Sequence, residues 1–292
     1  MLITGSASKF FKRKNTISLN GKLLDLTNPL VMGILNVSSD SFYDGGKYVT
    51  EDAVLKRVEQ MVKEGVDIVD VGAISTRPGS DSVSTKEELT RLLPAVTAIR
   101  KHFPDIPLSI DTFRSWVALR VIDETGECIV NDISGGNFDE HMFDTIAKLG
   151  VPYILMHIQG TPRTMQDNPQ YEDIIKDISK YFSDKVRKLT KAGVRDVIID
   201  PGFGFGKSLN DNYDLLNKLD SFKVFQLPLL VGLSRKSMVY KLLETDPENS
   251  LSGTITANTM ALLGGADILR VHDVREAVQS VSLFKKIKEV AK

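Results

Sequence analysis

The stretch Ile198-Ile-Asp-Pro-Gly-Phe-Gly-Phe-Gly-Lys207 decides the fold of this chain. Its β-branched start predicts a buried parallel strand that ends at Asp200, and the proline and three alternating glycines predict a tight loop after it. Ser208 or Asn210 can cap the helix that follows. The motif is neither a P-loop nor a dinucleotide fingerprint, because proline and lysine stand where those motifs need glycine. A carboxylate at such a strand end is a typical place for chemistry, and a plain turn capped by Asp200 is the alternative.

The same pattern of strand, loop and helix recurs along the 292 residues. Eight short β-rich runs alternate with amphipathic helical stripes, and no linker interrupts them. The predicted strands are residues 31–35, 67–71, 107–110, 128–130, 153–156, 197–199, 229–231 and 268–271. Eight such units predict an α/β fold, a (β/α)8 TIM barrel that makes residues 1–292 a single domain. A doubly wound open sheet is the alternative, because the sequence does not reveal strand order.

The N-terminal segment precedes the repeating part. Residues 1–15 are expected to be a tail, and residues 16–26 alternate around Asn20-Gly21, which predicts an N-terminal β-hairpin. We expect this hairpin to cover one end of the barrel.

Composition excludes several classes of protein. The formal net charge is −1, so no basic field attracts nucleic acid, and we expect no nucleic-acid partner. No apolar run is long enough to span a bilayer, so no membrane is expected. The single cysteine, Cys128, rules out an internal disulfide framework and suits the cytoplasm. Small molecules are the expected partners, and the residues at the strand ends, rather than composition, predict them.

Amide and carboxylate side chains follow several predicted strands. In a barrel they meet at the mouth, where active sites lie. This set suits a flat heterocycle that presents N–H donors and ring nitrogens. Its members are Asn36, Asp111, Asn131 and Asp200. Asp111 is equally suited to capping a helix, and Asp132 is expected only to cap a turn.

Cationic side chains also come after several predicted strands, so in a barrel they would lie at the same mouth as the amide and carboxylate side chains. They are Arg77, Lys236, Arg270 and His272. Cations that converge on a barrel mouth predict a phosphate or diphosphate ligand. The neutral oxygen of Asn36 fits a Mg²⁺ ion that keeps its water and binds substrate phosphate. His157 lacks a partner at metal-binding spacing, which argues against zinc.

These motifs closely resemble the dihydropteroate synthase family, over about residues 29–281. Any one motif is moderately specific, whereas eight in order are highly specific. They are Gly33-Ile-Leu-Asn-Val-Ser-Ser-Asp-Ser-Phe-Tyr-Asp-Gly-Gly46, Ser75-Thr-Arg-Pro-Gly79, Ile110-Asp-Thr112, Asn131-Asp-Ile-Ser-Gly-Gly136, Met156-His-Ile-Gln-Gly-Thr-Pro162, Asp200-Pro-Gly-Phe-Gly-Phe-Gly-Lys207, Gly232-Leu-Ser-Arg-Lys-Ser237 and Arg270-Val-His-Asp273. The resemblance implies a barrel, usually a homodimer, that acts in folate biosynthesis. It would join 6-hydroxymethyl-7,8-dihydropterin diphosphate to 4-aminobenzoate and release diphosphate and 7,8-dihydropteroate.

The resemblance also implies a role for each matching position. Asp111, Asn131, Asp200 and Lys236 are assigned to the pterin, Asn36 to Mg²⁺, and Arg270 and His272 to the diphosphate. Thr76 and Arg77 belong to the second loop of the mouth, Ser237 with Lys236 to the aminobenzoate carboxylate, and Phe205 with Pro78 to its ring. The catalytic set is then Arg77, Lys236, Arg270 and His272.

The chain departs from the family pattern in two loops. Ser38-Ser39 stands where the family has Thr-Pro, and Ala73-Ile74 where it has Gly-Glu. The changes can alter substrate affinity but leave the pterin and anion residues intact. Two rival functions are a pterin-binding methyltransferase of the same superfamily and a catalytically silent pterin-binding module. The motifs Ser75-Thr-Arg-Pro-Gly79 and Arg270-Val-His272 favour the synthase, because they serve aminobenzoate and diphosphate.

Overall fold

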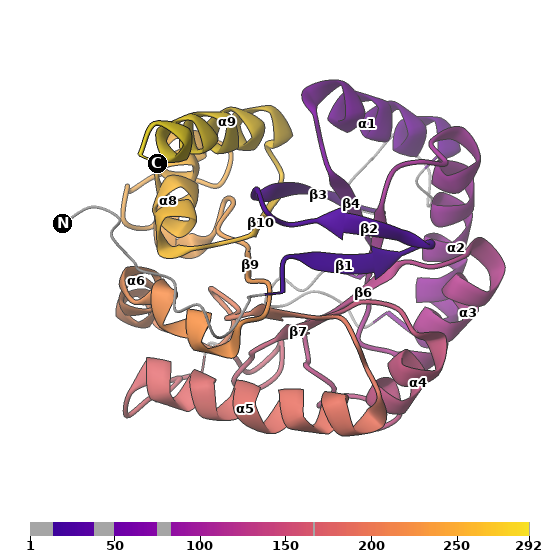
Figure 1. Ribbon diagram of the computed structural model, residues 1–292, viewed down its shortest axis with the longest axis horizontal. Coiled ribbons are helices and arrows are strands. Elements are labelled where there is room, and N and C mark those ends of the chain that lie inside the picture. Colours follow the sequence, from indigo (N-terminus) through magenta and orange to yellow (C-terminus); the bar gives the residue numbers. More distant parts are fainter. Residues whose placement is uncertain (1–13, 38–49, 75–82, 166, 292) are drawn as a thin grey trace.

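Eight parallel strands form a closed barrel in the computed structural model (Figure 1), which describes residues 14–37, 50–74, 83–165 and 167–291. The strands are β3 (Leu30–Asn36), β4 (Ile68–Gly72), β5 (Leu108–Asp111), β6 (Ile129–Asp132), β7 (Tyr153–Met156), β8 (Val197–Asp200), β9 (Leu230–Val231) and β10 (Ile268–Val271). Their order is β8-β7-β6-β5-β4-β3-β10-β9, and a parallel bridge between Ile199 and Leu229 joins the two ends. The predicted barrel is therefore confirmed, and the open-sheet alternative is wrong.

Helices surround the barrel (Figure 1). They are α1 (Glu51–Glu64), α2 (Thr85–His102), α3 (Ser115–Thr125), α4 (Met142–Leu149), α5 (Ile174–Ala192), α6 (Leu209–Asn217), the 3-10 helix η1 (Leu219–Phe225), α7 (Ser237–Tyr240), α8 (Leu251–Gly264) and α9 (Val274–Val290). Local sequence signals set their ends. Ser208, not Asn210, caps α6 through a capping box with Asp211, and Gly65 ends α1 with a φ of 92°.

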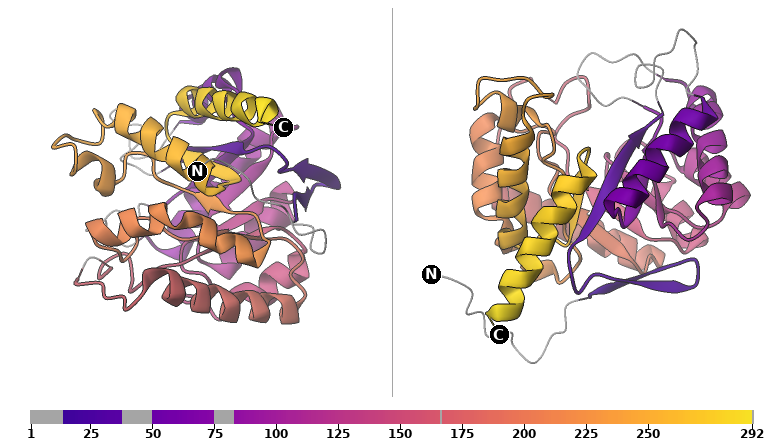
Figure 2. Two further views of the ribbon diagram at one scale, coloured as in Figure 1. Left: turned by 60° about the vertical axis from the view of Figure 1, so that its left-hand side comes forward. Right: turned by 90° about the horizontal axis from the view of Figure 1, so that it is seen from above.

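The predicted hairpin closes the N-terminal end of the barrel. β1 (Thr16–Leu19) and β2 (Lys22–Asp25) pair in antiparallel fashion around Asn20-Gly21. They lie across one end of the barrel (Figure 2, right). Ile17 and Leu19 pack against a ring of inward-facing apolar side chains, which includes Met32, Ile68, Ile129, Ile154, Ile198, Leu230 and Ile268. This ring and hairpin seal the barrel floor against water.

The inward-facing side chains change from apolar to polar one inward position further along the strands. Successive side chains of a strand point to opposite faces, so inward positions recur every second residue. In β4, Ile68 lies in the inner apolar ring, Val69 and Val71 pack outward against the helices, and Asp70 occupies the next inward position. Polar residues at this level create a hydrophilic layer above an apolar floor, at the carboxyl ends of the strands.

Three further expectations concern membrane helices, the single cysteine and the N-terminal tail. No helix in the described part of the chain is both long and apolar enough to cross a membrane. Cys128 is buried and unpaired, as predicted for a small core residue. The expected tail, residues 1–15, lies almost wholly outside the described residues.

Candidate functional site

Arg270 lies at the centre of the polar layer. Its Nε donates to Asp70 Oδ2 and its Nη2 to Asp111 Oδ2, each at 2.7 Å. Asn131 Nδ2 donates to the same Asp70 oxygen at 3.1 Å. The guanidinium from β10 thus bonds to β4 and β5, and Asp70 extends the network to β6. The alternative that Asp111 caps a helix is wrong, because Arg114 is the N-cap residue of α3 and makes no side-chain cap bond.

Burial dominates the electrostatics of this cluster. Desolvation, with a smaller contribution from the neighbouring carboxylate of Asp70, raises the pKa of Asp111 to about 7 against the pull of Arg270. Desolvation disfavours the charged guanidinium, but Asp70 and Asp111 outweigh it and raise the pKa of Arg270. Arg270 is therefore always charged, while Asp111 can gain or lose a proton near neutral pH.

Asp200 and Lys236 form the other side of the layer. Asp200 Oδ1 accepts from the Gly202 amide at 2.8 Å, and burial nevertheless raises the pKa of this carboxyl. Burial lowers the pKa of Lys236 to about 8, with Arg270 adding to the effect. The Lys236 ammonium lies 4.1 Å from the centre of the Phe205 ring, within cation–π range. The structure thus brings three predicted site residues together: Asp200, Phe205 and Lys236.

An apolar wall adjoins these polar groups. Ile133, Met156, Ile158 and Met165 form a small cluster separate from the main core, and Phe113 and Phe205 pack against it. Except for Phe205, the sequence did not single out these side chains, because apolar residues beside strands are typical of an ordinary core. A flat aromatic ligand suits such a wall, because its faces are apolar and its edge is polar.

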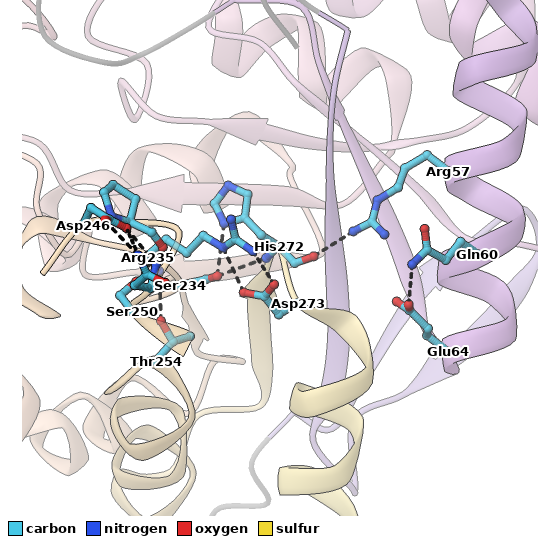
Figure 3. A network of polar contacts seen from close by, with 12 residues as sticks. Arg57, Gln60, Glu64, Ser234, Arg235, Asp246, Ser250, Thr254, His272 and Asp273 are labelled. Atoms are coloured by element: carbon cyan, nitrogen blue, oxygen red, sulfur yellow. Dashed lines mark hydrogen bonds and ion pairs between the residues drawn. The ribbon is translucent and has the colours of Figure 1, made fainter. Parts of the chain in front are cut away.

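His272 lines a cleft of about 520 Å³ beside the barrel mouth, between α1, β3 and the start of α9 (Figure 3). Its Nδ1 lies 3.1 Å from Ser234 Oγ, and its carbonyl accepts from Arg57 at 2.7 Å. Arg235 pairs with Asp273 through two hydrogen bonds, at 3.1 and 2.6 Å. These contacts hold His272 firmly at the inner side of the cleft.

The prediction that His272 carries a positive charge is wrong at neutral pH. Burial, followed by the positive charges of Arg270 and Arg235, lowers the pKa of His272 to about 4. The imidazole is therefore neutral and adds no net positive charge to the mouth. It retains an N–H group that can donate to an anion.

Asn36, the last residue of β3, lies near the carboxylate of Asp111. A Cβ atom placed on Gly72 would be 3.7 Å from Asn36 Oδ1 and 3.6 Å from Asp111 Oδ2, so the two oxygens face one small space. No group of three or more His, Cys, Asp or Glu within the described residues is arranged to hold a metal ion. A single neutral amide oxygen is the kind of ligand that suits a Mg²⁺ ion bound chiefly through water and phosphate.

Other predicted residues have simpler outcomes. Asp132 accepts from the Ser134 and Gly136 amides and from the Tyr153 hydroxyl, so its turn-capping role is confirmed. Ser237 is the first residue of α7, directly after Lys236. Thr76, Arg77 and Pro78 lie in residues 75–82, and Ser38-Ser39 lie in residues 38–49, both outside the described residues. Ala73 is buried, and its carbonyl accepts from Arg91 at 3.4 Å.

Two buried charged residues were missed in the sequence. Asp70 is fully buried, and its signal was a carboxylate inside the apolar run Ile68-Val-Asp-Val71. Lys207 is 3% exposed and contacts His157 Nδ1 at 3.1 Å. Its signal was a lysine that directly follows a glycine-rich loop, which we treated only as a mismatch to nucleotide-binding motifs.

The chain is similar to several known proteins. The family model described as "Pterin binding enzyme" matches residues 32–272. A dihydropteroate synthase of Escherichia coli K12 is 43% identical over 267 residues, which cover 91% of this chain and 94% of that protein. The Yersinia pestis dihydropteroate synthase with a sulfonamide drug complex has a TM-score of 0.88 and 40% identity, and the match covers 94% and 99% of the two chains. The Xanthomonas albilineans enzyme with 4-aminobenzoic acid has a TM-score of 0.87 and 35% identity, with coverage of 94% and 98%.

Proposed function

The chain belongs to the dihydropteroate synthases, a family of pterin-binding enzymes, and we propose how its barrel mouth carries out their reaction. The protein is a transferase. It condenses 6-hydroxymethyl-7,8-dihydropterin diphosphate with 4-aminobenzoate and yields 7,8-dihydropteroate and diphosphate, in folate biosynthesis. The observation that supports our assignment of roles is the polar layer of Asp111, Asn131, Asp200, Lys236 and Arg270 above a sealed apolar floor.

The pterin is proposed to bind in the polar layer. Asp200 accepts from its ring N–H groups, and Asn131 and Asp111 take further positions along its edge. These hydrogen bonds are strong because the surroundings are buried and at least one partner is charged. The apolar wall that includes Ile133 and Met156 covers one face of the ring.

The diphosphate is proposed to lie between the polar layer and the His272 cleft. Within the described residues the ion pairs of Arg270 use Nε and Nη2, and Nη1 is proposed to donate to a diphosphate oxygen. Negative charge grows on the leaving group as the C–O bond breaks. Arg270, Arg77 and the N–H of neutral His272 then bind the diphosphate more strongly than they bind the substrate, and this difference lowers the barrier.

The aminobenzoate is proposed to lie against Phe205, with its carboxylate on Lys236 and Ser237, and with Thr76 and Pro78 beside it. The pterin methylene cation left by diphosphate departure is delocalised over the ring. The arylamine attacks this carbon and then loses a proton. No strong base is required, because the amine is weakly basic and the electrophile is highly reactive.

Mg²⁺ is the proposed cofactor, with Asn36 as its protein ligand. When bound, the ion supplies positive charge that offsets the charge of the diphosphate. Asn36 would hold the ion, and the other residues of the site are proposed to bind and orient the two substrates.

A homodimer is the proposed assembly, and α8 and α9 supply the supporting observation. Met260 and Leu263 of α8 and Leu283 and Ile287 of α9 are large apolar residues that are more than half exposed. Met260→Glu combined with Leu263→Glu should convert the dimer to a monomer in sedimentation velocity. Leu23→Glu on the hairpin is a control, because Leu23 is 71% exposed and belongs to β2 rather than to these helices. A wild-type monomer would refute the dimer.

The cytoplasm is the proposed location, supported by the single buried cysteine. Cell fractionation tests it, and recovery with an exported fraction would contradict it.

Diphosphate release tests the whole scheme and separates the rivals. We expect release only when both pterin diphosphate and 4-aminobenzoate are present, with 7,8-dihydropteroate formed in equal amount. A silent module would bind pterin and release nothing. A methyltransferase would instead consume methyltetrahydrofolate in the presence of a corrinoid acceptor.

A further inference from the structure

Lys207 is a buried lysine that turns back beneath the loop joining β8 to α6. Its Nζ donates to the carbonyl oxygens of Gly202 at 2.8 Å and Phe205 at 3.0 Å, and it lies 3.1 Å from His157 Nδ1. An ammonium group has three donors, and these three acceptors satisfy all of them. The side chain therefore clamps two carbonyls of one loop to the histidine that follows the neighbouring strand.

Lys207 is not a surface lysine. It is only 3% exposed, whereas lysines ordinarily keep their ammonium in water. Burial lowers its pKa to about 7, although Asp200 favours the charged form. Burial and then Lys207 itself hold the pKa of His157 well below its usual value, so His157 is neutral and its Nδ1 can accept a hydrogen bond. Neither residue belongs to the set that we assign to substrate.

The backbone conformation of the loop around Lys207 is tightly restricted. Gly202 and Gly206 have positive φ values of 71° and 64°. A Cβ on Gly202 would lie 2.0 Å from the His157 carbonyl oxygen, and one on Gly206 would lie 2.3 Å from that of Gln159. The loop backbone is therefore pressed against the segment after β7, and its carbonyls turn inward toward Lys207.

This loop carries one group that bonds to Asp200 and one that lies beside Lys236, two residues that we assign to the substrates. The Gly202 amide donates to Asp200 Oδ1 at 2.8 Å, and the Phe205 ring lies 4.1 Å from Lys236 Nζ. Both groups belong to residues whose carbonyls Lys207 holds. A change in the loop would therefore reach the pterin acceptor and the aminobenzoate wall together.

We propose that Lys207, seated on His157, is a positioning residue for dihydropteroate synthesis: it holds the Gly202 and Phe205 carbonyls so that Asp200 and the Phe205 ring meet the two substrates. The proposal rests on the site assignment given above for Asp200 and Phe205. Lys207 itself touches neither substrate nor diphosphate.

Steady-state kinetics of Lys207→Met test this role, because methionine has a similar length and no donor. We expect the KM for 4-aminobenzoate to rise about tenfold and the KM for pterin diphosphate to rise less, with kcat within about threefold, as suits the loss of a positioning contact. Lys188→Met is the matched control, because Lys188 is exposed on α5 and should leave both constants unchanged.

A second pair of variants tests the histidine. His157→Gln retains an acceptor and should keep the KM for aminobenzoate within about twofold, whereas His157→Phe removes it and should resemble Lys207→Met. This pair keeps the proposal testable if Lys207→Met does not fold, which thermal unfolding will show.

The outcomes separate this proposal from the assigned function. Wild-type diphosphate release tests the function by itself. A folded Lys207→Met with an unchanged KM for aminobenzoate, or equal KM values for His157→Gln and His157→Phe, would overturn the positioning role. A fall in kcat alone would do so as well, because it would indicate direct participation in the chemistry.

Discussion

Arg270 Nε and Asp70 Oδ2 are 2.7 Å apart inside the barrel, although the two residues are 200 positions apart in the sequence. Asp70 is fully buried, and Arg270 adds a second ion pair to Asp111. A buried carboxylate is tolerable only beside such a partner, because transfer of an unpaired charge from water is costly. The pair therefore holds the polar layer together as well as supplying a cation to the site.

Arg270→Leu should lower the free energy of unfolding by about 3–5 kcal/mol, because it leaves Asp70 buried without its cation. Urea denaturation measures the loss. Arg275→Leu is the matched control and should change the free energy by less than about 0.5 kcal/mol, because Arg275 is 66% exposed and lies 4.0 Å from its nearest carboxylate. Adding Asp70→Asn to Arg270→Leu should recover part of the stability. An unchanged midpoint for Arg270→Leu would show that the pair has no structural role.

Asp200→Asn should weaken binding of pterin diphosphate by about 1.5–3 kcal/mol, because a charged acceptor for ring N–H groups is lost. The amide can still accept from the Gly202 N–H, so the loop should keep its shape. Calorimetric titration of the pterin gives the affinity, and thermal unfolding confirms the fold. Asp105→Asn, at a position 90% exposed, should bind normally. Wild-type affinity in a folded Asp200→Asn would remove Asp200 from the pterin site.

His272 should make the chain less stable in mild acid. In the unfolded chain its pKa is near 6.5, and in the folded chain about 4. Between these values the unfolded state holds more protons, so stability falls as the pH drops from about 6.5 to about 4. His272→Gln lacks this effect. The difference in free energy of unfolding should therefore move by about 2 kcal/mol in favour of the variant between about pH 7 and about pH 5.

Urea denaturation of both proteins at the two pH values measures this difference. Other titrating groups, including Asp111, act in both proteins and cancel in the comparison. A difference that does not change with pH would mean that His272 is charged in the folded protein, contrary to its burial.

Asn36→Ala should weaken Mg²⁺-dependent binding of diphosphate by about tenfold or more, because it removes the proposed protein ligand. Titration of diphosphate with and without Mg²⁺ measures the effect, and the two proteins should behave alike without the metal. Asn217→Ala, at the exposed end of α6, is the control. Equal weakening with and without Mg²⁺ would place Asn36 on the diphosphate itself.

The sequence by itself determined the barrel, the hairpin and most strand-end residues. These follow from local rules: β-branched runs form strands, glycines and caps end helices, and polar residues after strands meet at the mouth. Asn131, Asp200 and Lys236 could be identified because each comes directly after a predicted strand or in the loop that follows one, whereas Phe205 was identified only through the family resemblance. The family resemblance added their roles.

Tertiary structure alone decided which charges meet and which survive burial. Asp111 was equally suited to a cap or a ligand until Arg270, from the far end of the chain, was placed beside it. His272 was expected to be a cation, but its pKa depends on desolvation and on neighbours from other strands. Asp70 and Lys207 read as ordinary charged residues, and only packing buries them. Long-range contacts and local dielectric set these properties, and neither is encoded in the spacing of residues along one segment.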